Sequence, residues 1–101
     1  MALRHVVLFG FADTVDREAR DEIVRRFAAL PASLPGVDAF EWGVNASPEG
    51  LARGHTHAFL LTFASEAARD AYLIHPEHVA FATWVTPLVA TVTVVDYWAQ
   101  G

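Results

Sequence analysis

The chain has 101 residues, 53% of them hydrophobic and 19% charged, and this length supports one domain over residues 1–101 with one core. The net charge of −5 and the scattered Lys and Arg residues argue against nucleic acid and anionic membranes, which both need a clustered cationic face. The chain has no cysteine, so disulfides, thiolate nucleophiles and cysteine-based metal sites are excluded. Because no secretion signal or membrane-spanning run is recognised, we expect a cytoplasmic protein.

The first predicted elements are a strand and an amphipathic helix. Residues 4–11 are β-branched and aromatic, which predicts a strand. Asp16 is a suitable N-cap for the helix that follows, and we expect Pro31 to stop that helix. The helix should bury an apolar stripe whose members recur at helical spacing: Ala19, Ile23, Phe27 and Leu30.

The middle of the chain predicts two strands joined by a loop, followed by a second helix. Residues 37–45 form the second strand, the Pro and Gly residues within 47–54 mark the loop, and residues 56–63 form the third strand. Ser65 can cap the second helix. Its expected inward stripe consists of Ala68, Ala71, Tyr72 and His75.

A proline divides the last helical region before the final strand. Pro76 interrupts the second helix, a third helical stretch begins near Glu77, and Pro87 limits how far that stretch can continue. Residues 91–98 form the last strand. The third helical stretch should present one face made of His78, Phe81, Ala82 and Val85.

The resulting order, β-α-β-β-α-β, is the split βαβ arrangement of a ferredoxin-like α+β fold. Right-handed crossovers place the third strand between the first and second strands, and the first strand between the third and fourth strands. We therefore expect one four-stranded antiparallel sheet with the helices on a single face.

Both faces of the predicted sheet are apolar. Side chains alternate along a strand, which places one set under the helices: His5, Val7, Phe9, Phe11, His57, Phe59, Leu61, Phe63, Val92, Val94 and Asp96. The opposite face presents Val6, Leu8, Ala58, Leu60, Val95 and Tyr97. A face without helices is normally polar, so we expect this one to pack against an identical subunit and form a homodimer with a barrel-like core. The alternatives are a monomer with an exposed apolar face or a partner of different sequence.

Four polar side chains are expected to converge at one end of the apolar interior. His5 opens the first strand and Asp96 nearly closes the last, so antiparallel pairing brings them together, while Tyr72 and His78 point inward from the helices. We expect Asp96 to hold one ring nitrogen of His78, leaving the other as a base, and Tyr72 to donate to a carbonyl or enolate oxygen. Such a set suits removal of a proton next to a carbonyl group, the core step of an aldol-type ring closure. The alternative is a structural network that binds no substrate.

The remaining three histidines are weaker candidates for the functional site. His57 begins the third strand at the far end of the first strand from His5. His75 precedes Pro76 and fits a helix end, and His55 fits the loop. Five histidines raise the question of a metal site, but their spacing supports none.

Several segments resemble the stress-responsive dimeric α/β-barrel (Dabb) family. They are the opening RHVVLF at 4–9, LPGV at 34–37, GHTH at 54–57 with Thr62 and Phe63, YLIHPEH at 72–78, and VDY at 95–97. The Y-x-x-H-P-x-H pattern at 72–78 is the most specific of these. The resemblance implies a dimeric α/β barrel with an internal pocket in each subunit.

One branch of that family, the polyketide cyclases that form olivetolic acid, implies an activity, namely aldol closure of a linear polyketide without a cofactor. By this resemblance His78 is the catalytic base, Asp96 its partner and Tyr72 the pocket tyrosine, with His5 and His57 as further pocket residues. The bulk of Phe9, Phe59 and Trp84 predicts a narrow cavity, and therefore a smaller substrate or a filled cavity. The residues expected to bind the substrate are His5, Val7, Phe9, Ile23, Phe27, His57, Phe59, Leu61, Phe81 and Val94.

We therefore interpret the chain as a homodimeric pocket protein that acts on a small apolar carbonyl compound as a cofactor-free cyclase- or lyase-like enzyme. The alternative is a non-catalytic stress-responsive protein whose His, Tyr and Asp cluster is structural. A haem- or quinone-related monooxygenase of similar barrel shape is disfavoured by the Y-x-x-H-P-x-H pattern.

Overall fold

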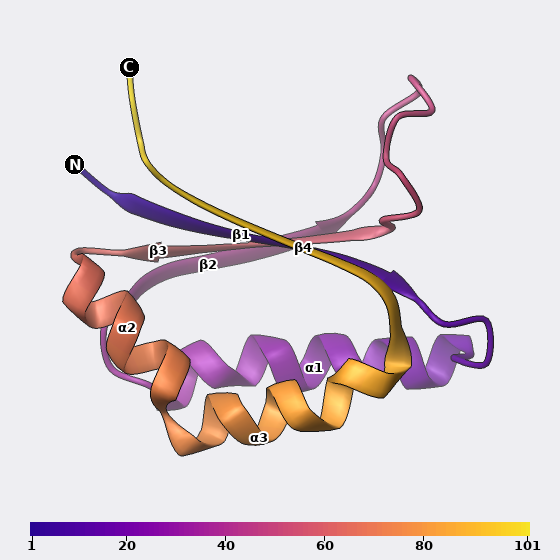
Figure 1. The fold of residues 1–101 in the computed structure, drawn as a ribbon, viewed down its shortest axis with the longest axis horizontal. Helices are drawn as coiled ribbons and strands as arrows, with labels where there is room; N and C mark the ends of the chain where they lie inside the picture. Colours follow the sequence, from indigo (N-terminus) through magenta and orange to yellow (C-terminus); the bar gives the residue numbers. More distant parts are fainter.

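Four strands and three α-helices follow one another in the predicted β-α-β-β-α-β order, with the second helical region divided in two (Figure 1). The structure is a computed structural model that describes residues 1–101. Its elements are β1 (Leu3–Phe11), α1 (Arg17–Ser33), β2 (Val37–Val44), β3 (His57–Phe63), α2 (Glu66–Ile74), α3 (Pro76–Val85), the 3₁₀ turn η1 (Thr86–Leu88) and β4 (Val89–Trp98).

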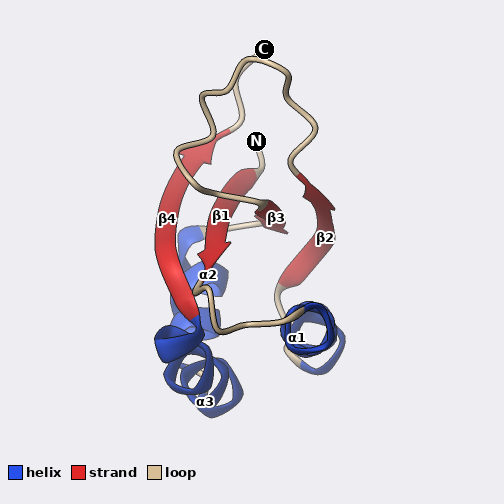
Figure 2. Ribbon diagram, turned by 90° about the vertical axis from the view of Figure 1, so that its right-hand side faces the viewer, coloured by secondary structure: helices blue, strands red, loops and turns tan.

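The four strands form one antiparallel sheet in the order β2-β3-β1-β4, which confirms the predicted ferredoxin-like topology (Figure 2). In the central register Val7 of β1 lies opposite Phe59 of β3 and Val94 of β4. The same register places His5 directly opposite Asp96. The expected meeting of these two polar side chains is therefore built into the strand pairing.

All three helices cover one face of the sheet, and the core lies between them and the strands (Figure 1). Phe27 of α1 stacks on Phe59 of β3 with ring centroids 4.2 Å apart and planes 9° from parallel. Burying an aromatic side chain of this size stabilises the fold by about 1.5–3 kcal/mol. No helix in the structure combines the length and the apolar character needed to cross a membrane.

The opposite face of the sheet carries no helix and remains apolar. Val95 is 54% exposed and Tyr97 46% exposed there, next to the half-buried Val6, Leu8 and Leu60. This is the alternation that the sequence predicts, with large apolar side chains on both faces. In a single subunit nothing packs against this face.

Helix α1 continues past Pro31 to Ser33, so the expectation that Pro31 stops the helix is wrong. Pro31 lies in the last turn, where its missing N–H leaves only the Phe27 carbonyl without its usual helical partner. The backbone N–H of Leu34 donates to the Leu30 carbonyl at 3.0 Å and closes the final turn. The inward stripe predicted for the second helix also needs correction, because Ala71 is exposed and only Tyr72 is fully buried in α2.

The end of the β2–β3 loop lies against β1, with a close backbone approach at Gly10. A Cβ atom added to Gly10 would overlap the carbonyl oxygen of Gly54 and the hydroxyl of Thr91. The Thr56 N–H donates to the Phe9 carbonyl at 2.8 Å and fixes the end of the loop. Gly54 has φ = +85°, a left-handed conformation that glycine adopts without strain. These two glycines allow the loop to lie against the strand.

Candidate active site

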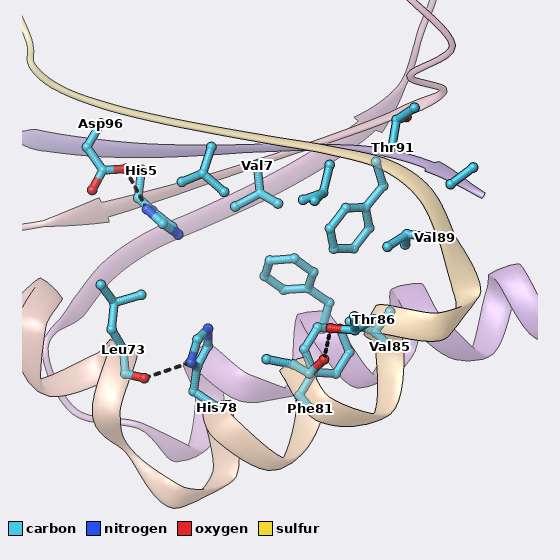
Figure 3. Close-up of a pocket in the computed structure, with 16 residues that line it drawn as sticks. His5, Val7, Leu73, His78, Phe81, Val85, Thr86, Val89, Thr91 and Asp96 are labelled. Carbon is cyan, nitrogen blue, oxygen red and sulfur yellow. Dashed lines mark hydrogen bonds and ion pairs between the residues drawn. The ribbon is translucent and has the colours of Figure 1, made fainter. Parts of the chain in front are cut away.

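A pocket of about 500 Å³ lies between the sheet and helix α3 (Figure 3). Its middle is lined by apolar side chains from β1, α1, α3 and β4: Val7, Phe9, Phe27, Phe81 and Val94. His5, His78 and Asp96 line one end, and Thr86 and Thr91 line the other (Figure 3). An apolar cavity with a few convergent polar groups is typical of small-molecule sites in both size and composition.

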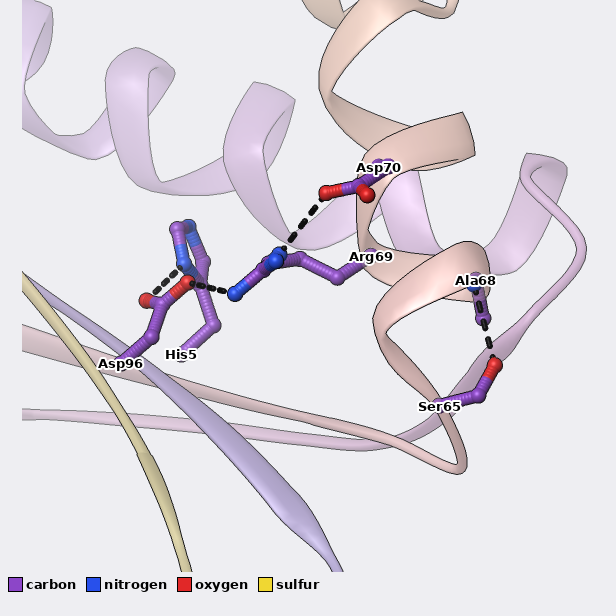
Figure 4. A network of polar contacts seen from close by, with 6 residues as sticks. All are labelled: His5, Ser65, Ala68, Arg69, Asp70 and Asp96. Carbon is purple, nitrogen blue, oxygen red and sulfur yellow. Dashed lines mark hydrogen bonds and ion pairs between the residues drawn. The ribbon is translucent and has the colours of Figure 1, made fainter.

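His5 and Asp96 form a short hydrogen bond where β1 begins and β4 ends. The Nδ1–H of His5 donates to Oδ1 of Asp96 across 2.6 Å, and the His5 side chain is only 6% exposed. Nη1 of Arg69 donates to the other carboxylate oxygen of Asp96 at 3.1 Å (Figure 4). Nε of Arg69 also donates to Asp70 at 3.1 Å, and the carboxylates of Asp70 and then Asp96 raise the pKa of Arg69 above its ordinary value. Asp96 therefore has both oxygens occupied by donors from different elements.

His78 is held by a backbone carbonyl rather than by a carboxylate. Its Nδ1–H donates to the Leu73 carbonyl at 3.0 Å, which fixes the tautomer and leaves Nε2 without a proton in the neutral ring. Figure 3 shows Nε2 of His78 and the corresponding nitrogen of His5 directed into the pocket. Burial lowers the pKa of His78, the Leu73 hydrogen bond opposes this, and the nearby His5 lowers it further. The imidazole is therefore a neutral base at neutral pH.

The break between α2 and α3 explains why the Leu73 carbonyl is available to His78. In an uninterrupted helix the Glu77 N–H would point at that carbonyl. Pro76 begins a new helix instead, and the Glu77 N–H donates to Nδ1 of His75, the N-cap of α3, at 3.2 Å. The central His-Pro of the Y-x-x-H-P-x-H pattern thus frees one carbonyl, and the second histidine of the pattern takes it.

Tyr72 packs behind the two histidines and does not line the pocket. Its ring centroid lies 4.6 Å from that of His78, 5.4 Å from that of Phe63 and 6.3 Å from that of His5. Its hydroxyl is buried and has no hydrogen-bond partner within the protein. Burial raises the pKa of Tyr72 well above its ordinary value, so the group stays a neutral hydroxyl. A buried, unpaired donor of this kind is unusual in a folded protein.

The expected hydrogen bond between Asp96 and His78 is absent, which corrects the predicted His–Asp pairing. Asp96 binds His5 and Arg69, whereas His78 binds the Leu73 carbonyl. The physical reason is the strand register, which holds the Asp96 carboxylate beside His5, while His78, in the first turn of α3, turns back to the C-terminal end of α2. No sequence pattern indicates a role for Arg69, although it lies three residues before Tyr72 and therefore on a similar face of α2.

Some of the predicted substrate-binding residues line the pocket and others do not. Those that line it are His5, Val7, Phe9, Phe27, Phe81 and Val94. Ile23, Phe59 and Leu61 are instead fully buried in the core, because they lie where α1 packs directly on the sheet. Lining residues that the sequence did not indicate include Leu73, Thr86, Val89 and Ala90.

His57 lies away from the main pocket, so its expected place beside the substrate needs correction. Its ring contacts Phe11 at 4.9 Å and is parallel to Trp42 at 6.0 Å. It lines a smaller hollow of about 240 Å³ with His55 near the β2–β3 loop. Burial lowers the pKa of His57. The antiparallel register explains the distance, because His57 pairs with Phe9 and not with the His5 end of β1.

The main pocket is open, so of the two alternatives, a smaller substrate or a filled cavity, only the filled cavity is contradicted. Phe9 forms part of the wall, but neither Phe59 nor Trp84 lines the pocket. Trp84 faces Arg26, whose guanidinium lies 4.1 Å from the ring centroid. No group of three or more His, Asp or Glu side chains is arranged to hold a metal ion.

Comparisons with known proteins relate this chain to one domain family. The sequence model described as "Stress responsive A/B Barrel Domain" matches residues 3–99. The stress-response A/B barrel domain-containing protein HS1 of Arabidopsis thaliana is 39% identical over 95 residues, covering 94% of this chain and 87% of that protein. Olivetolic acid cyclase of Cannabis sativa is 26% identical over 97 residues, covering 96% of each chain.

Solved structures confirm the fold and include a second enzyme. Hydroxynitrile lyase from Passiflora edulis superposes with a TM-score of 0.92 at 26% identity, covering 98% of this chain and 94% of that one. Three further structures with TM-scores between 0.73 and 0.82 are all described as dimeric proteins of unknown function with a ferredoxin-like fold.

Proposed function

The chain belongs to the stress-responsive A/B barrel domain family, and we propose that it is a cofactor-free enzyme that moves a proton at a small apolar carbonyl compound. The observation that carries this proposal is the state of His78. Its Nδ1 is committed to the Leu73 carbonyl, so Nε2 faces an apolar pocket as a neutral base. The names of two relatives, a cyclase and a lyase, support a catalytic role within this fold.

The proposed reaction begins at the carbon next to the substrate carbonyl. Nε2 of His78 removes a proton from that carbon, and the electron pair of the C–H bond moves toward the carbonyl oxygen to give an enolate. The enolate carbon then attacks a second carbonyl group and forms a carbon–carbon bond. The alkoxide produced takes the proton back from His78. Read in the opposite direction, the same sequence cleaves a carbon–carbon bond beside a hydroxyl group.

Two further side chains suit the developing negative charge on oxygen. Nε2 of His5 is directed into the pocket and donates a hydrogen bond when His5 is protonated. Tyr72 has a neutral, unpaired hydroxyl behind the two histidines and outside the pocket lining, so its proton serves a substrate oxygen only if that oxygen passes beyond the lining. In this assignment Asp96 orients His5, and not His78 as the sequence predicted.

The pocket favours a compact substrate with an apolar body. Val7, Phe81 and Val94 surround the middle of a cavity of about 500 Å³, and the histidines lie at one end. A carbonyl group placed between His5 and His78 leaves the rest of the molecule against these apolar walls. Burial of the apolar body supplies the binding free energy, about 0.8 kcal/mol for each buried CH₂ group.

We also propose that the protein is a homodimer through the helix-free face of the sheet. Val95 and Tyr97 would be buried there with Val6, Leu8 and Leu60. A contiguous apolar face of this kind is typical of a subunit interface, and similar structures are described as dimeric.

Exchange of carbon-bound hydrogen in deuterium oxide tests the enzymatic proposal directly. Benzylacetone is a suitable probe, because it has a methyl ketone and an apolar ring, and NMR follows the loss of its α-proton signals. We expect the protein to accelerate this exchange. The rate enhancement should be at least a hundredfold smaller in His78→Gln than in the wild type. His55→Gln is the matched control, because His55 lies in the β2–β3 loop outside the pocket and should keep the wild-type rate.

A structural role for the polar cluster is the second candidate, and one observation favours it. Asp96 joins β4 to His5 of β1 and to Arg69 of α2, so the cluster ties three elements together whether or not a substrate binds. In that case His78→Gln and wild type would exchange the probe at the same rate as buffer. Binding of the probe without exchange would likewise reject catalysis and leave a ligand-binding protein.

A further inference from the structure

Arg69 lies outside the pocket lining and contacts the lining residue Asp96. Its Nη1 donates to Oδ2 of Asp96 at 3.1 Å, while Oδ1 of the same carboxylate accepts from Nδ1 of His5 at 2.6 Å (Figure 4). Arg69 does not line the pocket. Its side chain and that of Asp96 are each 21% exposed, so the contact is shielded but not sealed from solvent.

The orientation of Arg69 is itself fixed by the neighbouring acidic residue. Nε of Arg69 donates to Oδ1 of Asp70 at 3.1 Å, so two different nitrogens of one guanidinium bind two carboxylates. A planar guanidinium held at two points presents its donors in a rigid arrangement. A lysine at this position would keep the charge but lose the two-point attachment.

The carboxylate of Asp96 needs such a restraint because its terminal torsion is soft. Rotation about that bond is broad and close to two-fold, so a carboxylate bound only by His5 can turn and exchange its oxygens. With Oδ2 held by Arg69, Oδ1 stays in the position where it accepts from His5. His5 Nδ1 is then committed to Asp96, and Nε2 stays directed into the pocket.

We propose that Arg69 is a positioning residue that, acting through Asp96, holds His5 ready for proton transfer at the substrate oxygen. When His78 takes the carbon-bound proton, a His5 ring that carries a proton on Nε2 passes it to the enolate oxygen of the proposed reaction, giving the neutral enol. As the new carbon–carbon bond forms, the enol O–H returns that proton to His5, and His78 gives its proton to the second carbonyl oxygen. Both histidines are restored, so the cycle balances without a cofactor. The catalytic part rests on the proposed function, whereas the orientation of His5 does not.

Two readouts on three arginine variants test this role. NMR of the histidine side chains reports the Nδ1–H proton of His5, which a short bond to a fixed carboxylate should protect from exchange with water. We expect this signal in the wild type, its loss by rapid exchange in Arg69→Gln, and partial recovery in Arg69→Lys. Arg26→Gln is the matched control, because Arg26 also forms an ion pair, with Glu22 at 3.2 Å, but its side chain is 53% exposed and bonds neither Asp96 nor His5.

The second readout is exchange of benzylacetone by the same proteins. In Arg69→Gln we expect kcat to fall about tenfold to a hundredfold while KM stays within twofold of the wild-type value. The reason is that the His5 imidazole is misplaced but still present. Thermal unfolding at equal protein concentration shows whether Arg69→Gln remains folded. If the His5 Nδ1–H signal is unchanged in folded Arg69→Gln, the positioning role is overturned, even in an active enzyme. A different outcome is a wild type that fails to exchange the α-protons of benzylacetone while the His5 Nδ1–H signal still depends on Arg69. In that case the proposed function fails and the orienting role of Arg69 stands.

Discussion

The unpaired hydroxyl of Tyr72 leads to the prediction that Tyr72→Phe makes the protein more stable. The hydroxyl is buried without a hydrogen-bond partner, and such a group costs about 1–3 kcal/mol of folding free energy. Phe keeps the ring that contacts His78 at 4.6 Å and Phe63 at 5.4 Å, so no cavity forms. We therefore expect the free energy of unfolding to rise by about 1–3 kcal/mol, and the midpoint of thermal unfolding to rise by about 4 °C or more.

Urea titration of wild type and Tyr72→Phe measures this gain, with both proteins at the same concentration because subunit association contributes to stability. Thr14→Val is the control, since it also removes a hydroxyl with little change of shape, and Thr14 is exposed in the connection between β1 and α1, outside the strands of the helix-free face. That variant should change stability by less than about 0.5 kcal/mol. If Tyr72→Phe is less stable than wild type, the hydroxyl has a partner in solution and the reasoning fails.

The pH dependence of stability gives an independent check on Tyr72. Burial raises its pKa in the folded protein, whereas the unfolded chain titrates near the ordinary value of 10.0. Above that pH the unfolded chain has lost a proton that the folded protein keeps. The free energy of unfolding of wild type should therefore fall by about 1.4 kcal/mol per pH unit as pH rises past 10.0, until the folded group also titrates. Tyr72→Phe should lack this component.

The same variant separates stability from activity. If the Tyr72 hydroxyl donates to the substrate oxygen, its removal should slow benzylacetone exchange by about a hundredfold, comparable with loss of one oxyanion donor. A protein that gains stability and loses activity identifies a group that is kept for its chemistry. An unchanged exchange rate would remove Tyr72 from the mechanism and leave it a packing residue.

Three further predictions concern other parts of the fold. Burial lowers the pKa of His78, so below its ordinary value of 6.5 the unfolded chain binds a proton that the folded protein resists. Urea titrations between pH 7 and pH 5 should show falling stability, with a shallower fall in His78→Gln. Gly10→Ala should cost about 1–3 kcal/mol in thermal unfolding, because its Cβ would overlap the Gly54 carbonyl, and an unchanged midpoint would mean the loop is not held there. Val95→Lys should convert the dimer to a monomer in sedimentation analysis, whereas a wild-type monomer would refute the proposed interface.

Patterns that are local or periodic predicted most of the fold. The Asp16 and Ser65 caps lie where the sequence places them, because a cap depends on a side chain and the next three residues. The antiparallel pairing of the first and last strands correctly predicted that His5 would lie beside Asp96, since strand pairing converts sequence position directly into register. Pro31 does not stop the helix, because a proline in the last turn disturbs little that follows it.

The partners of the polar side chains could not be predicted in the same way. Both His5 and His78 were within plausible reach of Asp96, and the choice depends on a few ångströms of helix placement that periodicity does not encode. Arg69 reaches Asp96 from α2, and this contact becomes visible only once the helix lies on the sheet. The far wall of the pocket could not be predicted from sequence patterns either, because the 3₁₀ turn before β4 sets the positions of Thr86 and Val89.

The interruption of the helix at Pro76 has a consequence for how proteins of this shape diversify. The fold is stabilised by the sheet and its core. The tautomer of His78 depends instead on the Leu73 carbonyl, which has no helical partner at the junction between α2 and α3. A substitution confined to the α2–α3 junction can therefore abolish or restore His78 as a base while the backbone elsewhere stays the same. Two chains that superpose almost perfectly can thus differ in whether they react with anything, and the residues around the junction are the place to look for the difference.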